Sequence, residues 1–100
     1  MPAFEHKMRA RVWLYSGPAA WHFVTLPRKQ SDEIKALFGK AQRGWGSLPV
    51  IASVGNTSWK TSIWVDKKSG AYLLAIKAEV RKKEGIAVDQ LIDFKVQIRP

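Results

Sequence analysis

Two histidines and eight carboxylates are the side chains that could carry acid–base chemistry in this chain of 100 residues, which holds no cysteine. General acid–base catalysis needs such groups at hydrogen-bond distance from a reacting atom. An enzyme would use His22 with a nearby carboxylate and Arg43, because His6 lies in a terminal segment. We instead interpret His22 as a structural or surface residue. No spacing of His, Asp and Glu brings three metal ligands together, so we expect no catalytic residue, no metal site and no cofactor.

A basic excess is the second source of chemistry. The net charge is +9, and residues 1–43 hold 8 basic and 3 acidic side chains, an excess of +5. Arg9 and Arg11 alternate with Trp13 and Tyr15, so all four share one face of a strand. Guanidinium and aromatic groups on one face suit contacts with phosphates and stacking of bases. The alternative is that the chain covers both aromatics and leaves two solvated arginines. A nucleic-acid site would use Arg9, Arg11, Arg28, Lys29, Arg43 and Lys60.

The glycine-rich segment Arg43–Ser47 is a candidate anion-binding loop. Glycines allow backbone N–H groups to turn toward an anion, and Arg43 could bind a phosphate or carboxylate. However, the Walker pattern is missing and no helix follows. We favour a loop that bends into a strand while Trp45 covers one end of the fold, and a role in some ligand or partner surface stays open.

Two further tryptophans lie in one predicted strand on opposite faces. Trp59 shares a face with Ile63, whereas Trp64 shares the other face with Lys60. One tryptophan must therefore point away from the interior. Exposed, it would mark a ligand or protein contact. We favour the alternative, in which a helix lies over it.

The elements that position these side chains are mainly strands, because apolar and polar residues alternate with a period of two. Gly55-Asn56 is a two-residue hairpin signal. Strands are expected at residues 9–15, 21–26, 48–54, 57–65, 71–76 and 94–98, and helices at residues 31–38 and 77–84. In the first strand, Ala10, Val12 and Leu14 should share the buried face.

Both predicted helices carry terminal signals. Ser31 is the expected N-cap of the first helix, and Asp32 and Glu33 complement its dipole. Gly39 and Gly85 stand where a left-handed residue ends a helix.

An internal repeat organises the chain. Residues 32–39 align with residues 78–85, and the order strand-strand-helix-strand occurs twice. Six strands in an open sheet would leave two bare edges, so we expect closure into a small barrel. The prediction is one domain over residues 1–100: a mainly β, closed barrel of about six strands with two short helices and pseudo-two-fold symmetry. The longest apolar run, Ala71–Ile76, is too short to span a membrane, and no signal peptide is evident, so we expect a cytoplasmic protein.

Four blocks of the sequence resemble the bacterial domain of unknown function 1905 family. These blocks are Ala20–Pro27, Arg43–Val50, Gly55–Ser62 and Lys77–Gly85. The resemblance implies a small closed barrel of the double-split kind. It implies no activity, because that family has no established reaction or site residues.

A weaker resemblance concerns Leu74–Ile86, which is similar to the strand-helix-strand core of AbrB-like and MazE-like transcription factors. Those proteins build a similar barrel from two chains and bind DNA. This chain departs from them at Lys77, where proline is usual, and at Asp89-Gln90, which replaces a glycine-aspartate turn. DNA binding does not follow from such fold similarity.

The sequence therefore favours a non-catalytic binding or accessory module of unknown ligand, with nucleic-acid binding through a basic and aromatic face as the alternative. The partner would be nucleic acid or another anionic ligand, with no membrane contact, and the protein would be a monomer or weak dimer. The candidate binding residues are Arg9, Arg11, Trp13, Arg43, Trp45, Asn56, Trp59 and Lys60.

Overall fold

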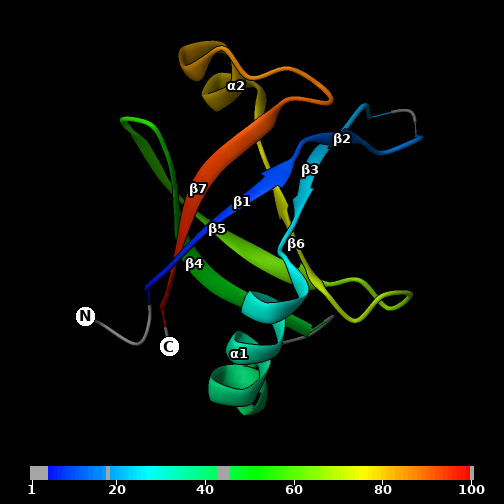
Figure 1. The fold of residues 1–100 in the computed structure, drawn as a ribbon, viewed down its shortest axis with the longest axis vertical. Coiled ribbons are helices and arrows are strands. Elements are labelled where there is room, and N and C mark those ends of the chain that lie inside the picture. The colour runs from blue at the N-terminus through cyan, green and yellow to red at the C-terminus, as the bar shows by residue number, and fades with distance from the viewer. Residues whose placement is uncertain (1–4, 18, 43–45, 100) are drawn as a thin grey trace.

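In the computed structural model, which describes residues 5–17, 19–42 and 46–99, the strands form one curled antiparallel sheet (Figure 1). Two helices lie at opposite ends of this sheet. The sheet order is β1-β7-β4-β5-β6-β3-β2, seven strands among the described residues. The strands are β1 (Glu5–Arg11), β2 (Trp13–Leu14), β3 (His22–Thr25), β4 (Ser47–Val54), β5 (Thr57–Val65), β6 (Tyr72–Ala75) and β7 (Leu91–Ile98). The helices are α1 (Arg28–Phe38), which continues into a 3-10 turn (Gly39–Ala41), and α2 (Ala78–Glu84).

The mainly β architecture with two short helices is confirmed, but the strand number is seven rather than six. Val12 interrupts the first predicted strand, because its N–H donates to Gln90 O at 2.9 Å and its carbonyl accepts from Asp89 N at 2.8 Å. At Val12, these bonds to the turn before β7 take the place of regular pairing with a neighbouring strand. The chain pairs with β7 before Val12 and with β3 after it.

The repeated element order is also found. Strands β1/β2 and β3, helix α1 and strand β4 are followed by β5, β6, α2 and β7. The pairing repeats as well. In the second half, β5 pairs with β4 and then, near its carboxyl end, with β6. In the first half, β1 pairs with β7 and β2 with β3.

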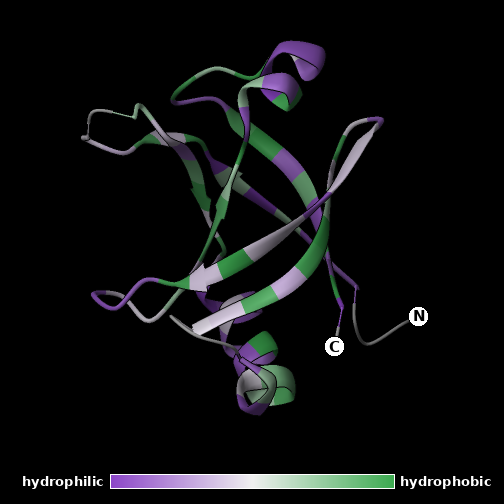
Figure 2. Ribbon diagram, turned by 180° about the vertical axis from the view of Figure 1, so that it is seen from behind, coloured by the Kyte–Doolittle hydropathy of each residue, from purple (hydrophilic) through white to green (hydrophobic). Residues whose placement is uncertain are grey.

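The core lies inside the curl of the sheet, and strand alternation decides which side chains enter it. In β4, the side chains of Leu48, Val50, Ala52 and Val54 are buried, while those between them are partly exposed. Figure 2 shows the matching alternation of hydrophobic and hydrophilic segments along the strands. Burial of each large aliphatic side chain contributes about 1.5–3 kcal/mol. The fully buried larger residues are Tyr72, Leu26, Ile34, Leu48, Ile63, Leu74, Ile76, Val12, Val24, Val50, Val80 and Val96.

One predicted core residue lies outside. Val12 is buried as expected and Ala10 is partly buried, but Leu14 is about half exposed. After Val12 the chain leaves β7, and Leu14 pairs with His22 in the two-residue strand β2 at the edge of the sheet. The period-two pattern cannot reveal such a change of neighbouring strand.

The first helix begins one turn earlier than predicted, and Ser31 is not its N-cap. Helix α1 starts after Pro27, whose φ of −53° suits a helix start. Ser31 is buried inside the helix, where its hydroxyl donates to Leu26 O at 3.0 Å and accepts from Tyr72 N at 3.1 Å. The first turn of α1 consequently holds no acidic residue.

The two predicted helix-ending glycines differ. Gly39 has φ −56° and leads into the 3-10 turn, so the left-handed conformation expected there is wrong. Gly85 has φ 64° and ends α2 as predicted. No helix within the described part of the chain is long and apolar enough to cross a membrane.

Candidate functional site

A groove of about 630 Å³ lies beside β3, β5 and β6, and we call it the aromatic groove. Its volume falls within the range of small-molecule sites, about 300–1,000 Å³. The lining residues are Tyr15, Trp21, Phe23, Thr61, Trp64, Val65, Asp66, Lys67, Leu73 and Ala75.

Strand pairing assembles the aromatic groove from separate parts of the chain. Trp21 and Phe23 lie two residues apart and so project from the same face of the chain. Phe23 pairs with Ala75 across β3 and β6, and Trp64 pairs with Leu73 across β5 and β6. Three strands therefore bring their outward apolar side chains together.

Phe23 is the centre of an aromatic cluster at one wall of this groove. The ring of Trp21 stacks on it at 6.0 Å with an interplanar angle of 14°, and the ring of Tyr15 meets it edge-on at 6.2 Å. Trp13 contacts Phe23 from β2 at 5.2 Å, and its indole N–H donates to Thr25 Oγ1 at 2.9 Å. These contacts hold the rings of this wall against one another.

The aromatic groove leaves large apolar surfaces open to solvent. Trp21, Tyr15 and Trp64 are 51%, 52% and 50% exposed. The expectation that a helix covers the outward tryptophan is therefore wrong for Trp64. Helix α2 instead approaches the opposite end of β5, where Glu84 accepts a hydrogen bond from Thr57. Clustered exposed aromatics mark interaction surfaces more often than scattered ones.

A second groove, of about 610 Å³, lies over β1, β7 and the β4–β5 hairpin, and we call it the polar groove. One row of pairs crosses its floor: Lys7 with Lys95, Lys95 with Ser53, and Ser53 with Ser58. The lining residues are Lys7, Met8, Arg9, Ser53, Gly55, Asn56, Ser58, Asp93, Phe94 and Lys95.

Some of the basic side chains around the polar groove form ion pairs with carboxylates. Arg9 donates to both carboxylate oxygens of Asp93, at 2.6 and 3.2 Å. This hydrogen bonding, with the attraction between the two charges, lowers the pKa of Asp93 and raises the pKa of Arg9. Lys95 Nζ lies 3.6 Å from a carboxylate oxygen of Glu5.

The structure brings together only some of the predicted binding residues. Arg9 and Asn56 line the polar groove, and Trp13 supports the wall of the aromatic groove. Trp59 packs against the core, and Lys60 is exposed but lines neither groove. The side chain of Arg11 donates to Asp89 O at 2.7 Å and so serves the turn before β7. The predicted residues Arg43 and Trp45 lie outside the described residues, as does most of the loop that contains them.

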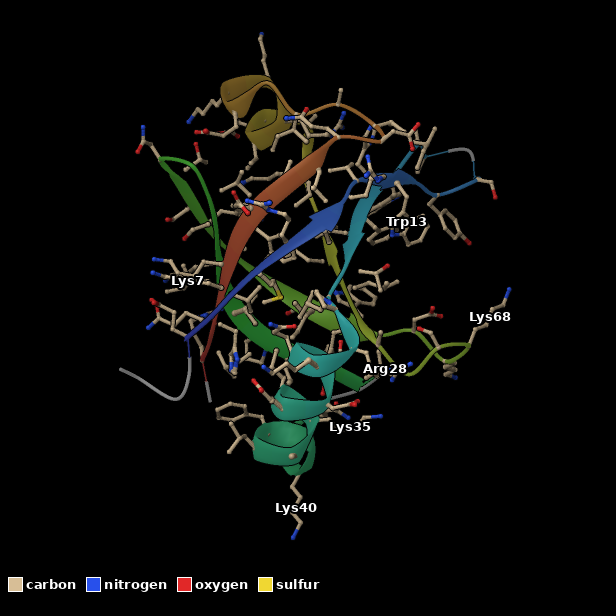
Figure 3. The ribbon with its side chains drawn as sticks, viewed as in Figure 1. Lys7, Trp13, Arg28, Lys35, Lys40 and Lys68 are labelled. Carbon is tan, nitrogen blue, oxygen red and sulfur yellow. The ribbon has the colours of Figure 1, made fainter. Side chains whose placement is uncertain are left out.

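Basic residues lie on several sides of the described structure. Arg28 bonds to Ser69 O and lies 3.6 Å from Asp32, at the start of α1. Figure 3 places Lys7 on one side of the view, Lys68 on the other, and Lys40 at the far end beyond α1. The positive charge is thus distributed around the molecule.

His22 is held by its neighbours in the described structure. Its Nδ1 lies 3.0 Å from Ala20 O, and its Nε2 lies 3.4 Å from Nη1 of Arg81. His22 lines neither groove. These contacts suit a structural role, with the Nδ1 hydrogen donated to Ala20 and Nε2 accepting from Arg81.

Sequence reasoning missed the partners that complete each groove. The spacing of Trp21 and Phe23 would have put them on one face, but nothing in the sequence places Trp64 near them. The pairing of Lys7 with Lys95 likewise joins the two ends of the chain. A contact between such distant residues has no local signal.

The chain belongs to the family described as "Domain of unknown function (DUF1905)", which matches residues 9–96. The matched range includes every lining residue of the two grooves except Lys7 and Met8. No curated protein is significantly similar to the chain. The resemblance to AbrB-like and MazE-like factors stays a prediction.

Proposed function

We propose that this protein is a non-catalytic binding module whose ligand occupies the aromatic groove. The observation that supports this role is the half-exposed state of Trp21, Tyr15 and Trp64 around one apolar groove. Stacked or edge-on rings offer a rigid surface for a flat apolar group, at little loss of side-chain entropy on binding. The carboxylate of Asp66 is held in place at this site, since it accepts hydrogen bonds from Ser69 Oγ and Lys68 N.

Nuclear magnetic resonance tests this role through the tryptophan indole N–H signals. Titration with planar aromatic fragments, such as indole derivatives and quinoline, should shift the signals of Trp21 and Trp64. The signal of Trp59, which packs against the core, is the internal control. The variants Trp21→Ala and Trp64→Ala should each weaken binding, whereas Leu37→Ala, an exposed apolar residue of α1, should not. Fragments that shift no groove signal, or that shift all indoles alike, would rule out this site.

Nucleic-acid binding is the second candidate. Its site would be the aromatic groove rather than the basic face predicted from the sequence. Arg9 and Arg11 are engaged with Asp93 and Asp89, whereas the aromatic groove offers open rings. Exposed Lys77 lies near Trp21, because the bond from Ile76 N to His22 O extends the β3–β6 ladder. A base stacked on Trp21 would place its phosphate near this ammonium group.

Fluorescence anisotropy with a labelled ten-nucleotide oligothymidine tests this candidate. Loss of one stacked base in Trp21→Ala should weaken binding by about 5- to 150-fold, the equivalent of about 1–3 kcal/mol. The logarithm of affinity should fall with the logarithm of salt concentration by about 0.7 per neutralised phosphate. Lys77→Ala should reduce this slope, and Lys40→Ala, at the far end of the molecule, should not. Unchanged anisotropy at low salt would exclude single-stranded nucleic acid.

We also propose that the curled sheet closes into a barrel of the double-split kind. Support comes from its two edge strands, β1 and β2, which are separated by Val12 alone. In a closed barrel the amide protons of Val12 and Tyr15 exchange slowly, because their bonds to Gln90 O and Trp21 O hold the junction between β1 and β2 to the segments that precede β7 and β3. Rapid exchange at both amides beside slow exchange in β4 would show an open sheet.

A further inference from the structure

Two lysines stand directly opposite one another in the floor of the polar groove. Lys7 on β1 pairs with Lys95 on β7. Opposed residues of an antiparallel pair carry their side chains on the same face, with their β-carbons about 4.5–5.5 Å apart. Like charges placed in this way repel each other, so the pair destabilises the unliganded fold.

Among the residues that the structure describes, one member of this lysine pair has a carboxylate partner. Lys95 Nζ lies 3.6 Å from Glu5. Within the described part of the chain, no carboxylate lies within ion-pair distance of Lys7. The carboxylate that lines the groove, Asp93, accepts two hydrogen bonds from Arg9. The repulsion between Lys7 and Lys95 is therefore only partly relieved inside the protein.

The neighbours of the lysine pair are hydrogen-bond donors. Ser53 pairs with Lys95, and its hydroxyl lies 2.8 Å from that of Ser58. One hydroxyl hydrogen is used between the two serines, and the other is left to donate outward. Asn56, exposed at the hairpin turn, adds an amide. Three cationic lining residues, Lys7, Arg9 and Lys95, stand against Asp93 and the nearby Glu5, which leaves one net positive charge.

We propose that the polar groove binds a phosphate monoester, with its phosphate group between Lys7 and Lys95. A monoester carries about −1.5 to −2 charges near neutral pH and three acceptor oxygens, which matches two ammonium groups beside a hydroxyl. A groove of about 610 Å³ has room for the organic part of the molecule as well as its phosphate. The site is separate from the aromatic groove and does not depend on the function proposed for it.

Thermal unfolding with inorganic phosphate and with glycerol phosphate tests the proposal at matched ionic strength in sodium chloride. A ligand that binds only the folded state raises the unfolding temperature as its concentration passes the dissociation constant. Both phosphates should do so, and glycerol should not. Stronger binding of glycerol phosphate than of inorganic phosphate identifies the monoester as the ligand class. Equal or weaker binding would restrict the site to free phosphate and overturn the monoester assignment.

The variant Lys7→Ala separates binding from general charge effects. Without ligand it should unfold at a temperature equal to or above that of the natural protein, because the repulsion is gone. Its affinity for phosphate should be lower by about 10-fold or more, the loss of one charged hydrogen-bond partner. Lys40→Ala removes the same charge far from the groove and should leave the affinity unchanged. An equal loss in both variants, or no loss in Lys7→Ala, would overturn the proposal.

Discussion

Arg9 and Asp93 face each other across β1 and β7 and are joined by hydrogen bonds of 2.6 and 3.2 Å. The pair explains why an arginine that looked free for ligand binding in the sequence is engaged in the fold. The hydrogen bond from Arg9 is the main cause of the lowered pKa of Asp93.

The Arg9–Asp93 pair should make stability depend on pH in the acid range. Because the pKa of Asp93 is lower in the folded state, its stabilising effect is present above the unfolded value of about 3.9 and disappears as pH falls through the folded value. Asp93→Asn should therefore lower the urea midpoint at pH 7, with no difference from the natural protein once Asp93 is protonated. In Arg9→Ala the pKa of Asp93, followed by carboxyl carbon resonance, should rise. Arg11→Ala, which loses a bond to a backbone carbonyl instead, should leave it low.

The hydroxyl of Ser31 should contribute strongly to stability. It lies buried between α1 and β6, where it donates to Leu26 O and accepts from Tyr72 N. Ser31→Ala leaves the N–H of Tyr72 without that acceptor, and a buried unpaired group costs about 1–3 kcal/mol. Urea unfolding measures this loss. Ser16→Ala, at an exposed position, is the control, and equal effects of the two changes would contradict the role given to Ser31.

Gly55 and Gly85 allow the effect of one side chain to be isolated. Both have positive φ, 56° and 64°, so alanine strains the backbone similarly at either site. A β-carbon at Gly85 meets nothing within 4 Å, whereas at Gly55 it would stand 2.1 Å from Glu84 Oε1. Gly55→Ala should therefore displace the Glu84 carboxylate and break its 2.6 Å hydrogen bond from Thr57.

Gly55→Ala should lower the free energy of unfolding by about 1.5–3 kcal/mol more than Gly85→Ala does, the usual contribution of a hydrogen bond to a charged group. Chemical denaturation of both variants gives this difference. It should largely vanish when Glu84 is also changed to alanine. A difference that persists in the Glu84→Ala background would show that backbone strain, not the carboxylate, distinguishes the two glycines.

Tyr72 should limit stability at alkaline pH. Burial raises the pKa of its phenol above the usual value of 10.0, and its hydroxyl donates to Gln42 Oε1. The folded state thus favours the protonated phenol. This contribution is complete below the unfolded pKa and is lost as pH rises through the folded one. Tyr72→Phe should unfold with less dependence on pH above 10 than the natural protein, as followed by far-ultraviolet circular dichroism. An unchanged alkaline transition would contradict this role of Tyr72.

Local patterns predicted the elements but not their partners. The alternation of Leu48, Val50, Ala52 and Val54 indicated β4, and Gly85 indicated the end of α2, because each signal depends on nearby residues. The prediction that Ser31 is an N-cap was wrong because the same hydroxyl can either cap a helix or bond inside the core. Only the position of β6 decides between these two roles. The expected cover over Trp64 failed for a similar reason, since the approach of α2 to one end of β5 is a tertiary property.

Apart from the break at Val12, the sequence by itself determined the order of strands and helices, and it also determined the basic charge and the faces on which aromatic residues alternate. These depend on backbone period and side-chain type, which are local. The tertiary structure alone decided that Trp64 joins Trp21 and Phe23, that Asp93 engages Arg9, and that Lys7 meets Lys95. Each of these depends on strand register between distant segments, and register is set by the packing of the whole core rather than by either strand.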